Sequence, residues 1–436
     1  MIAAVVLLVT LVAQAVVPRA RLLIVLSGAA VSLLSCVISG TADTRTLFAD
    51  VPWDVLVIVV ALGLLSEYLA SSRVFGLLAL HATRASAADP VRVLILFCTG
   101  MYCVSGLVNN ITALLLVLPV MLALLKLIGV DQRYVSWTLG ATLVACNLGG
   151  AATPTGDFPA ILLLGRGAMT FTDYLSSALP QTAVALVLML VVVLAIRPAR
   201  DLEREGLGSR LALRIMEQLY RNTTLDRRRF LPGIASLVLM FGCWSLLPAS
   251  TGVGPELIAG VGCLLALVST PLWSERLLRT RVDVEAVLFL LALFLMVGAV
   301  RASGAFVALG DQLTALPLSD RGQVIVFFCV VAVSTGLFSA GPGMAAFLDV
   351  AERLAARHDP ATIYVGLAMS VCAGSSLFLT AATSGPMAQV LTERASIIGI
   401  GGETIRFGFL QHMRPGLLGF AITLATGIAF AWPRLG

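Results

Sequence analysis

A long apolar segment of this chain is interrupted by the polar run Asn147-Leu-Gly-Gly-Ala-Ala-Thr-Pro-Thr-Gly-Asp-Phe-Pro159. Its glycines and prolines are expected to unwind a helix. Asp157 places a carboxyl group at membrane depth, where such groups are costly and usually functional. Irregular backbone survives inside a bilayer only where it is buried in protein or lines a wet cavity. The run therefore predicts a broken membrane helix beside a functional cavity.

The composition around this run excludes a water-soluble domain. Of 436 residues, 59% are hydrophobic and 12% are charged, whereas soluble domains carry about 25% charged residues. The eight cysteines form no CxxC pair, and the three histidines fall in predicted loops without clustering. No catalytic triad or phosphate loop stands out. We therefore expect neither an enzyme nor a nucleic-acid partner, and no cofactor beyond a coupling ion.

Ten apolar segments are predicted to cross the bilayer, which needs about 20 residues per helix. They are 2–17, 22–39, 53–70, 135–165 (interrupted), 174–196, 231–248, 253–272, 285–301, 362–396 (interrupted) and 416–432. Two further stretches, 93–128 and 324–356, are too long for one crossing, and polar residues break each near its middle. If both are re-entrant hairpins, most of the 29 basic residues lie on one face, as the positive-inside rule requires.

The two halves of the chain resemble each other. Residues 54–75 align with 285–306, and the breaks follow in the same order in each half. The predicted fold class is an all-α polytopic membrane protein, an inverted repeat of five transmembrane helices and one re-entrant hairpin per half. The predicted units are a first repeat, 1–197, a basic cytoplasmic linker, 198–230, and a second repeat, 231–436. The excess of arginine over lysine suggests a GC-rich bacterial genome, so the expected location is the bacterial inner membrane.

Polar residues at the breaks are the candidate site. Amide and hydroxyl oxygens could bind a cation, and helix starts at the breaks could bind an anion. The asparagines could instead only join helices, and Asp157 could be a helix cap. The candidates for binding substrate or ion are Asn109, Asn110, Thr112, Asn147, Gly149, Gly150, Thr153, Thr155, Asp157, Ser339, Gly341, Ser375, Ser376 and Thr380.

At two of these stretches the chain resembles the ion transporter superfamily, which includes arsenite permeases, D-type sodium/proton antiporters and divalent anion:sodium symporters. Residues 104–119 look like that family's first hairpin, and 147–159 look like its broken-helix signature. The resemblance implies an elevator or rocking carrier, with sodium at Asn109, Asn110, Gly149 and Thr153. It leaves a homodimer open.

The chain also departs from that family. The first tip has Asn109-Asn110 where many relatives have an aspartate, and Phe158 and Ala160 replace the usual proline and asparagine. The second tip keeps Pro342 but lacks the family's asparagine. The departures leave the second cation site in question.

The sequence thus favours a secondary active transporter, a permease that moves a small organic or inorganic anion with a sodium or proton gradient. One alternative is a sodium/proton antiporter in which Asp157 titrates. The other is a non-transporting membrane protein or pump subunit. The expected partners are the lipid bilayer and the small-ion substrate.

Overall fold

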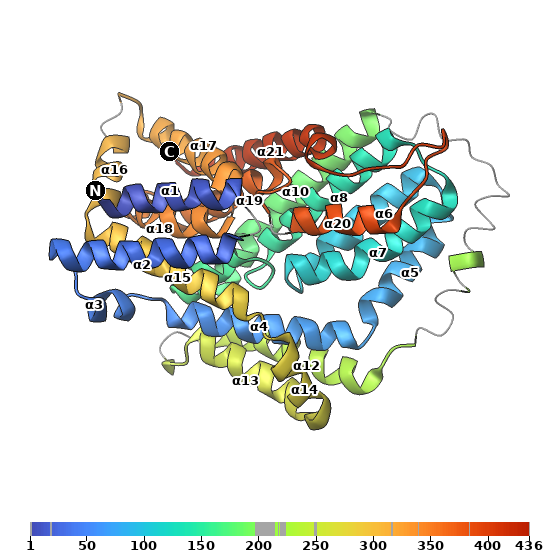
Figure 1. The fold of residues 1–436 in the computed structure, drawn as a ribbon, viewed down its shortest axis with the longest axis horizontal. Helices are drawn as coiled ribbons and strands as arrows, with labels where there is room; N and C mark the ends of the chain where they lie inside the picture. Colours follow the sequence, from blue (N-terminus) through green and yellow to red (C-terminus); the bar gives the residue numbers. More distant parts are fainter. Residues whose placement is uncertain are drawn as a thin grey trace.

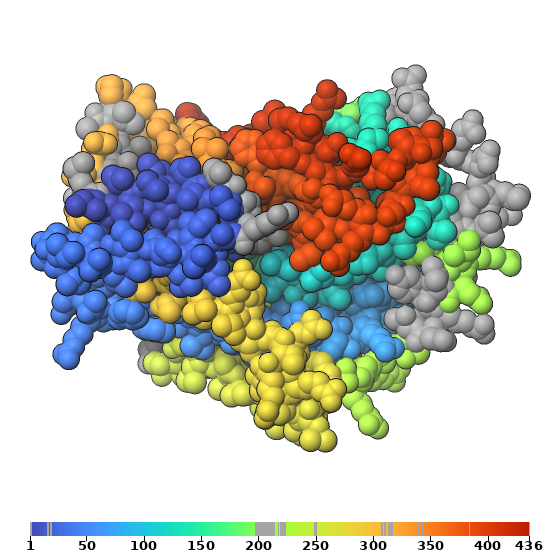
Figure 2. Space-filling model, viewed as in Figure 1, coloured from blue at the N-terminus to red at the C-terminus, as the bar shows by residue number. Residues whose placement is uncertain are grey.

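The computed structural model describes residues 2–17, 20–196, 214–216, 218, 224–247, 251–314, 317–338, 340–382 and 384–435. Within them the regular structure is helical, apart from one isolated bridge between Ile398 and Thr404. Most of the long helices run roughly along the long axis of the molecule (Figure 1). Segments from both halves of the chain border a hollow on one face (Figure 2). The predicted all-helical membrane fold is confirmed.

The helices of the first half run from α1 to α10. In chain order they are α1 (Ile2–Val16), α2 (Arg21–Ser39), α3 (Thr44–Ala49), α4 (Trp53–Ser71), α5 (Val74–Ser86), α6 (Pro90–Ser105), α7 (Asn110–Ile128), α8 (Gln132–Ala152), α9 (Phe158–Gly165) and α10 (Phe171–Ile196).

The helices of the second half follow the same order. They are α12 (Arg227–Leu246), α13 (Pro255–Val268), α14 (Pro271–Arg281), α15 (Val284–Ala302), α16 (Ala305–Thr314), α17 (Asp320–Phe338), α18 (Ala340–Ala355), α19 (Pro360–Leu377), α20 (Ser384–Ala395), α21 (Phe409–Ala431) and a short 3₁₀ turn, η3 (Trp432–Arg434). Each of α12–α21 therefore has a counterpart among α1–α10. The unit boundaries at 197 and 230 stay a prediction, because most of 198–230 lies outside the described residues.

Ten helices of the described chain are long and apolar enough to cross a membrane. They differ in part from the predicted ten, because they include the hairpin arms α7 and α17 but not α1 or α13, which are shorter apolar helices. Helix α13 ends at Val268, not at residue 272, since Pro271 starts a separate helix, α14. Length alone therefore does not separate a crossing from a hairpin arm.

The position of the hairpin tips makes that distinction. Helices α6 and α7 lie toward one end of the long axis, and α17 and α18 lie toward the other (Figure 1). The first tip does not continue across the bundle, because it meets the break between α8 and α9. There the Thr153 hydroxyl donates to the Gly106 carbonyl at 2.6 Å. The hairpins are re-entrant and enter from opposite ends, as the inverted repeat predicts.

Four shorter helices, α3, α5, α14 and α16, lie outside the predicted crossings, apart from the first two residues of α14. The search for apolar crossings of about 20 residues missed them because they are short and carry polar residues. Their positions are the same in the two halves, before and after α4 and α15. The expectation that the histidines sit in loops was wrong for His81, which lies in α5, and for His412, which lies in α21.

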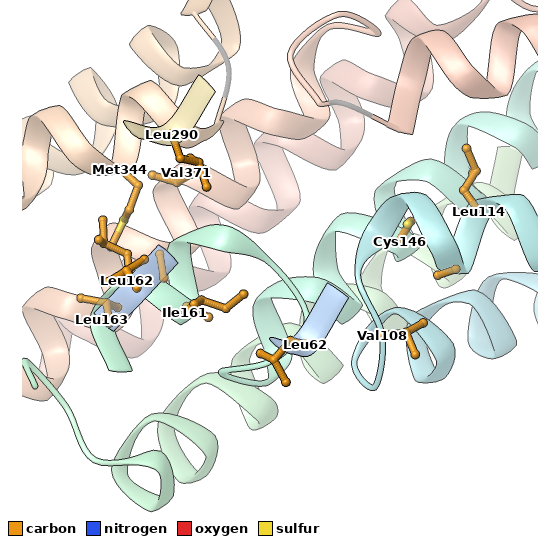
Figure 3. Close-up of a cluster of buried hydrophobic side chains, with 14 of the residues drawn as sticks. Leu62, Val108, Leu114, Cys146, Ile161, Leu162, Leu163, Leu290, Met344 and Val371 are labelled. Atoms are coloured by element: carbon orange, nitrogen blue, oxygen red, sulfur yellow. The ribbon is translucent and has the colours of Figure 1, made fainter. Parts of the chain in front are cut away.

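The apolar core is continuous between the two halves. Ile161, Leu162 and Leu163 of α9 are buried close to Met344 of α18 and Leu290 of α15 (Figure 3). These contacts bring the second hairpin against the broken helix of the first half. Neither half therefore encloses its own core.

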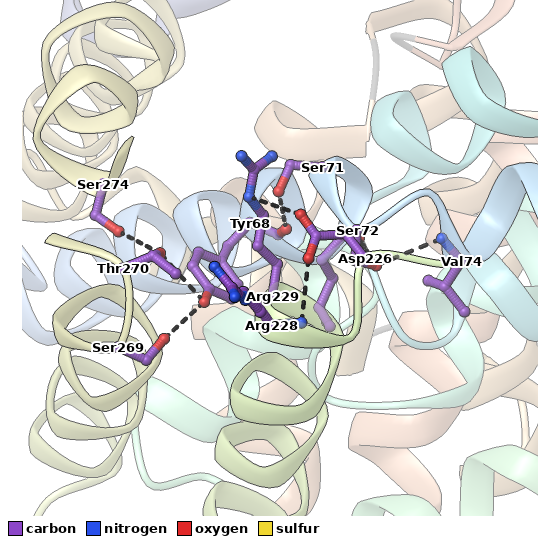
Figure 4. Close-up of polar contacts among 11 residues, drawn as sticks. Tyr68, Ser71, Ser72, Val74, Asp226, Arg228, Arg229, Ser269, Thr270 and Ser274 are labelled. Carbon is purple, nitrogen blue, oxygen red and sulfur yellow. Dashed lines mark hydrogen bonds and ion pairs between the residues drawn. The ribbon is translucent and has the colours of Figure 1, made fainter. Parts of the chain in front are cut away.

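Near the C-terminal end of α4, the second half is joined to the first by polar contacts (Figure 4). The Tyr68 hydroxyl lies 2.7 Å from that of Ser269. The Arg229 guanidinium lies 4.4 Å from the centroid of the Trp273 ring, and the Asp226 amide donates to the Ser72 carbonyl at 3.0 Å. The end of the basic linker is thus anchored beside the C-terminal end of α4.

Candidate functional site: a cavity between two hairpin tips

A cavity of about 460 Å³ lies where the two hairpins and the two broken helices face α4 and α15. Figure 2 shows this face, on which α15 (yellow), α7 (teal) and α20 (red-orange) surround a recessed area. Among the predicted site residues, seven line the cavity: Asn109, Asn110, Thr112, Thr155, Asp157, Gly341 and Ser375. Residues from both halves of the sequence therefore contribute to one site.

Asn109 sits at the first hairpin tip and begins helix α7. Its side-chain oxygen accepts from the Thr112 amide at 2.8 Å, which satisfies one of the free N–H groups of the first turn. The side-chain NH₂ group is left for other partners. Asn109 is thus a helix cap that also faces the cavity.

Asn110 is buried and joins the hairpin to the broken helix. Its side-chain oxygen and the Cys146 carbonyl, the latter at 2.7 Å, share the single donor hydrogen of the Ser105 hydroxyl. The Asn110 amide and the Asp157 side chain both lie beside Gly150, where a Cβ would crowd them. Gly150 therefore leaves the space in which these two polar groups meet.

The break in the first half is shorter than predicted. Gly149 and Gly150 were expected to unwind the backbone, yet both are helical, because α8 continues to Ala152. A Cβ on Gly149 would overlap the Tyr102 carbonyl of α6, so this glycine provides close helix packing. The irregular backbone is confined to 153–157.

Asp157 caps α9 and lines the cavity. Its carboxylate accepts from the Phe158 amide at 2.9 Å, so the capping interpretation is correct. Because the side chain also faces the cavity, capping and a role in the site are compatible. It is the one carboxylate among the cavity residues contributed by the broken helices and hairpin tips.

The other described candidates do not line the cavity. Asn147 is buried, and its Nδ2 donates to the Ser376 hydroxyl at 3.1 Å. The Thr153 hydroxyl donates to the Gly106 carbonyl. Thr380 is exposed in the second break. Ser339 lies outside the described residues. Of the expected sodium ligands, Asn109 and Asn110 line the cavity, whereas Gly149 and Thr153 pack the hairpin against the break.

Two buried side chains that sequence reasoning missed support the breaks. The Tyr174 hydroxyl of α10 donates to the Ala151 carbonyl at 2.8 Å. His412 of α21 places its Nε2 3.1 Å from the Ser376 carbonyl. Both carbonyls lie near the end of a broken helix, where they lack helical partners. An alignment of α10 with α21 could have found this pair.

Three helix N-termini from the hairpin tips and the first break lie at the cavity. The first residues of α7 and α9, Asn110 and Phe158, line it, as do Ala340 and Gly341 of α18. A helix N-terminus carries about half a positive charge and exposes free N–H donors. The described part of the chain has no group of three or more His, Cys, Asp or Glu residues that could hold a metal. Amide and hydroxyl oxygens with one carboxylate suit a hard cation or a proton.

An inverted repeat with two re-entrant hairpins and two broken helices around one cavity defines a membrane transporter. Residues 4–374 match the model of the family described as "Citrate transporter". The chain therefore belongs to the citrate transporter family. The expectation that it is not an enzyme agrees with this family.

Similar proteins occur in bacteria. An uncharacterized transporter of Mycobacterium tuberculosis is 25% identical over 421 residues, which are 95% of this chain and 94% of the relative. The magnetosome protein MamN of Magnetospirillum gryphiswaldense is 28% identical over 416 residues, 93% and 92% of the two chains. The solved structure of the Alcanivorax borkumensis YdaH transporter covers 90% of this chain and 88% of its own, at 15% identity and a TM-score of 0.48. The chain is a multi-pass protein of the bacterial inner membrane.

Proposed function

We propose that this protein is a secondary active carrier of a small anion, driven by a sodium or proton gradient. The observation that carries the proposal is the convergence of three helix N-termini on the cavity of about 460 Å³. Their positive ends favour a negative charge at that point. The family description favours an organic carboxylate such as citrate.

In this proposal, Asp157 is the coupling group. A carboxylate beside an anion site is repulsive unless a proton or a cation neutralises it. Binding of H⁺ or Na⁺ at Asp157, assisted by Asn110 beside it, would therefore have to accompany binding of the anion. The Asp157 side chain would then couple movement of the anion to the gradient of H⁺ or Na⁺.

A sodium/proton antiporter is the second candidate. It is favoured by the one observation that Asp157 lines the cavity with the amides of Asn109 and Asn110. In that case sodium and a proton would compete for one carboxylate, and no anion would be carried. The convergent helix N-termini would then have no substrate role.

Uptake into proteoliposomes tests these candidates. The full-length protein would be given citrate, a C4-dicarboxylate, sulfate or arsenite, with and without an inward sodium gradient, while an internal dye reports pH. We expect gradient-driven uptake of at least one anion. Asn109→Ala and Asp157→Asn should each lower it about tenfold or more, since each removes polar contacts worth more than about 1.4 kcal/mol.

The matched control is Asp173→Asn, which removes an exposed carboxylate of α10 outside the cavity. It should transport like the unmodified protein. Sodium-dependent proton release without anion uptake, lost in Asp157→Asn, would establish the antiporter instead. Silence in both assays would contradict the carrier.

A further inference from the structure

A second cavity, of about 420 Å³, lies where α4 ends and α12 begins. It is lined by Ser71, Arg73 and residues 224–229, and it shares no residue with the cavity between the hairpin tips. We call it the arginine pocket, because four of its residues are arginines and only one, Asp226, is acidic. The proposed carrier function makes no use of this excess of positive charge.

The arginine pocket lies at the level of a bilayer surface. Two candidate membrane spans meet there, one of which ends at Ser71 while the other begins at Arg227. The ring of Trp273 lies beside it, with the Arg229 guanidinium 4.4 Å from its centroid, and tryptophan is enriched where a membrane meets water. Because a membrane span ends where the lipid headgroups begin, the pocket is expected to face headgroups on the predicted cytoplasmic side.

Three of the four arginines are available to a ligand. Arg229 is engaged, because its Nε lies 3.3 Å from the Asp226 carboxylate. Across the described ranges of the chain, the side chains of Arg73, Arg227 and Arg228 make no ion pair or hydrogen bond. All three are exposed. The one acidic group of the pocket therefore leaves their positive charges without a partner.

Arg73 has a backbone conformation that disfavours arginine. Its φ of 64° lies in the left-handed region, which glycine adopts freely and a residue with a Cβ does not. The equivalent residue of the second half, Gly304, has a φ of 73° and is a glycine. An ion pair with Glu67 of α4 does not explain the arginine, because Glu67 lies 3.9 Å from Arg281 instead. The first half thus places a charged side chain at a position where the fold favours glycine.

An exposed apolar stripe on α12 begins beside the arginine pocket. Leu231 is 59% exposed and Val238 is 64% exposed, and with Ala235 they follow Arg227 at helical spacing along one face. Because α12 is a candidate membrane span, this face is expected to contact lipid chains. The pocket therefore joins a site for a phosphate group to a surface for an acyl chain, whereas a free phosphate would use only the first.

We propose that the arginine pocket binds the phosphate of an anionic phospholipid through Arg73, Arg227 and Arg228. Guanidinium N–H groups match the oxygens of a phosphate, and basic clusters next to a membrane span attract anionic lipids. The lipid would bridge the end of α4 and the start of α12, which belong to different halves of the chain. This inference does not depend on what the carrier transports.

Thermal unfolding of the purified full-length protein in nonionic detergent tests this, because a ligand that binds only the folded state raises the unfolding midpoint. The protein would be titrated with phosphatidylglycerol, with phosphatidylcholine of the same acyl chains, or with inorganic phosphate. Phosphatidylglycerol should raise the midpoint at a concentration at least about tenfold lower than either of the others. Equal effects of the two lipids would overturn the proposal. An equal effect of inorganic phosphate would assign the pocket to free phosphate and overturn the lipid.

Arg227→Gln combined with Arg228→Gln should weaken phosphatidylglycerol binding about tenfold or more, because two charge-assisted contacts are lost. The matched control is Arg276→Gln combined with Arg414→Gln, which removes two exposed positive charges from α14 and α21 outside the pocket. It should bind like the unmodified protein. An equal loss in the control would show a general effect of surface charge, and unchanged binding in the first variant would remove the site. Either result would overturn the proposal.

Arg73→Gly separates binding from folding. Without lipid, this variant should unfold at the same midpoint as the unmodified protein or a higher one, since glycine fits the left-handed conformation. Its binding of phosphatidylglycerol should nevertheless be about threefold weaker or more. A lower midpoint without lipid would show that Arg73 serves the fold, and unchanged lipid binding would show that it does not contact the phosphate. Either result would overturn the role proposed for Arg73.

Discussion

At the scale of single residues, the polar groups of the breaks serve the fold and the cavity together. Asp157 caps α9 through the Phe158 amide and lines the cavity. Asn109 caps α7 through the Thr112 amide and lines the same cavity. A side chain held by its own helix needs no further support to keep its position. Two polar residues of the site, Asn109 and Asp157, are therefore also helix caps.

Tyr174 gives a stability prediction at this scale. Tyr174→Phe removes the hydroxyl that donates to the buried Ala151 carbonyl. A buried acceptor left without a donor costs about 1–3 kcal/mol. We expect the free energy of unfolding of the purified protein to fall by that amount. The loss would be measured as a lower midpoint of denaturant or thermal unfolding. Tyr364→Phe is the control, since within the described residues its hydroxyl makes no hydrogen bond that could be lost. An equal loss of stability in the two variants would contradict the account.

The sequence identified seven of the residues that line the cavity, but not their contacts. Glycine, proline and paired asparagines in an apolar segment indicate the breaks, because such residues are costly in lipid. It could not indicate that Gly149 packs on a carbonyl or that Tyr174 and His412 cap the broken helices. Those contacts join residues far apart in the chain. Arg21 also lines the cavity, and nothing in the sequence distinguishes it from the other arginines.

At the scale of elements, each half attaches its hairpin to its broken helix through a glycine. A Cβ on Gly149 of α8 would overlap the Tyr102 carbonyl of α6. In the second half, a Cβ on Gly374 of α19 would overlap the Ala332 carbonyl of α17. The two contacts are equivalent in the inverted repeat. This packing holds each hairpin tip beside its break.

Gly149→Ala should therefore displace the first hairpin. Overpacking of this kind typically costs about 1–3 kcal/mol, and the tip residues Asn109 and Asn110 would move with the hairpin. We expect lower thermal stability and weaker anion uptake. Gly100→Ala in α6 is the control, because a Cβ there meets nothing within 4 Å. It should be neutral or slightly stabilising, and a similar loss in both variants would count against the packing argument.

At the scale of the whole molecule, the two halves enclose one cavity that neither could form alone. Arg281 and Asp283 line the cavity, and the distribution of arginine predicts that this end faces the cytoplasm. At the other end of α15, Arg301 forms a two-bond ion pair with Asp349 of α18. That pair joins the second hairpin to α15 on the opposite side. The order of the long apolar helices and the two hairpins could be predicted from hydropathy and charge, whereas the short helices α3, α5, α14 and α16 could not.

The most direct test of the account is the accessibility of a cysteine at the second hairpin tip. Gly341→Cys in a cysteine-free background would be treated with a membrane-impermeant thiol reagent on either side of sealed vesicles, with lipid-facing Val187→Cys as the control. The account predicts labelling of Gly341→Cys from the cytoplasmic side and protection by the transported ion. Labelling only from the outside, or from neither side, would contradict a cavity shared by the two hairpin tips and open to the cytoplasm.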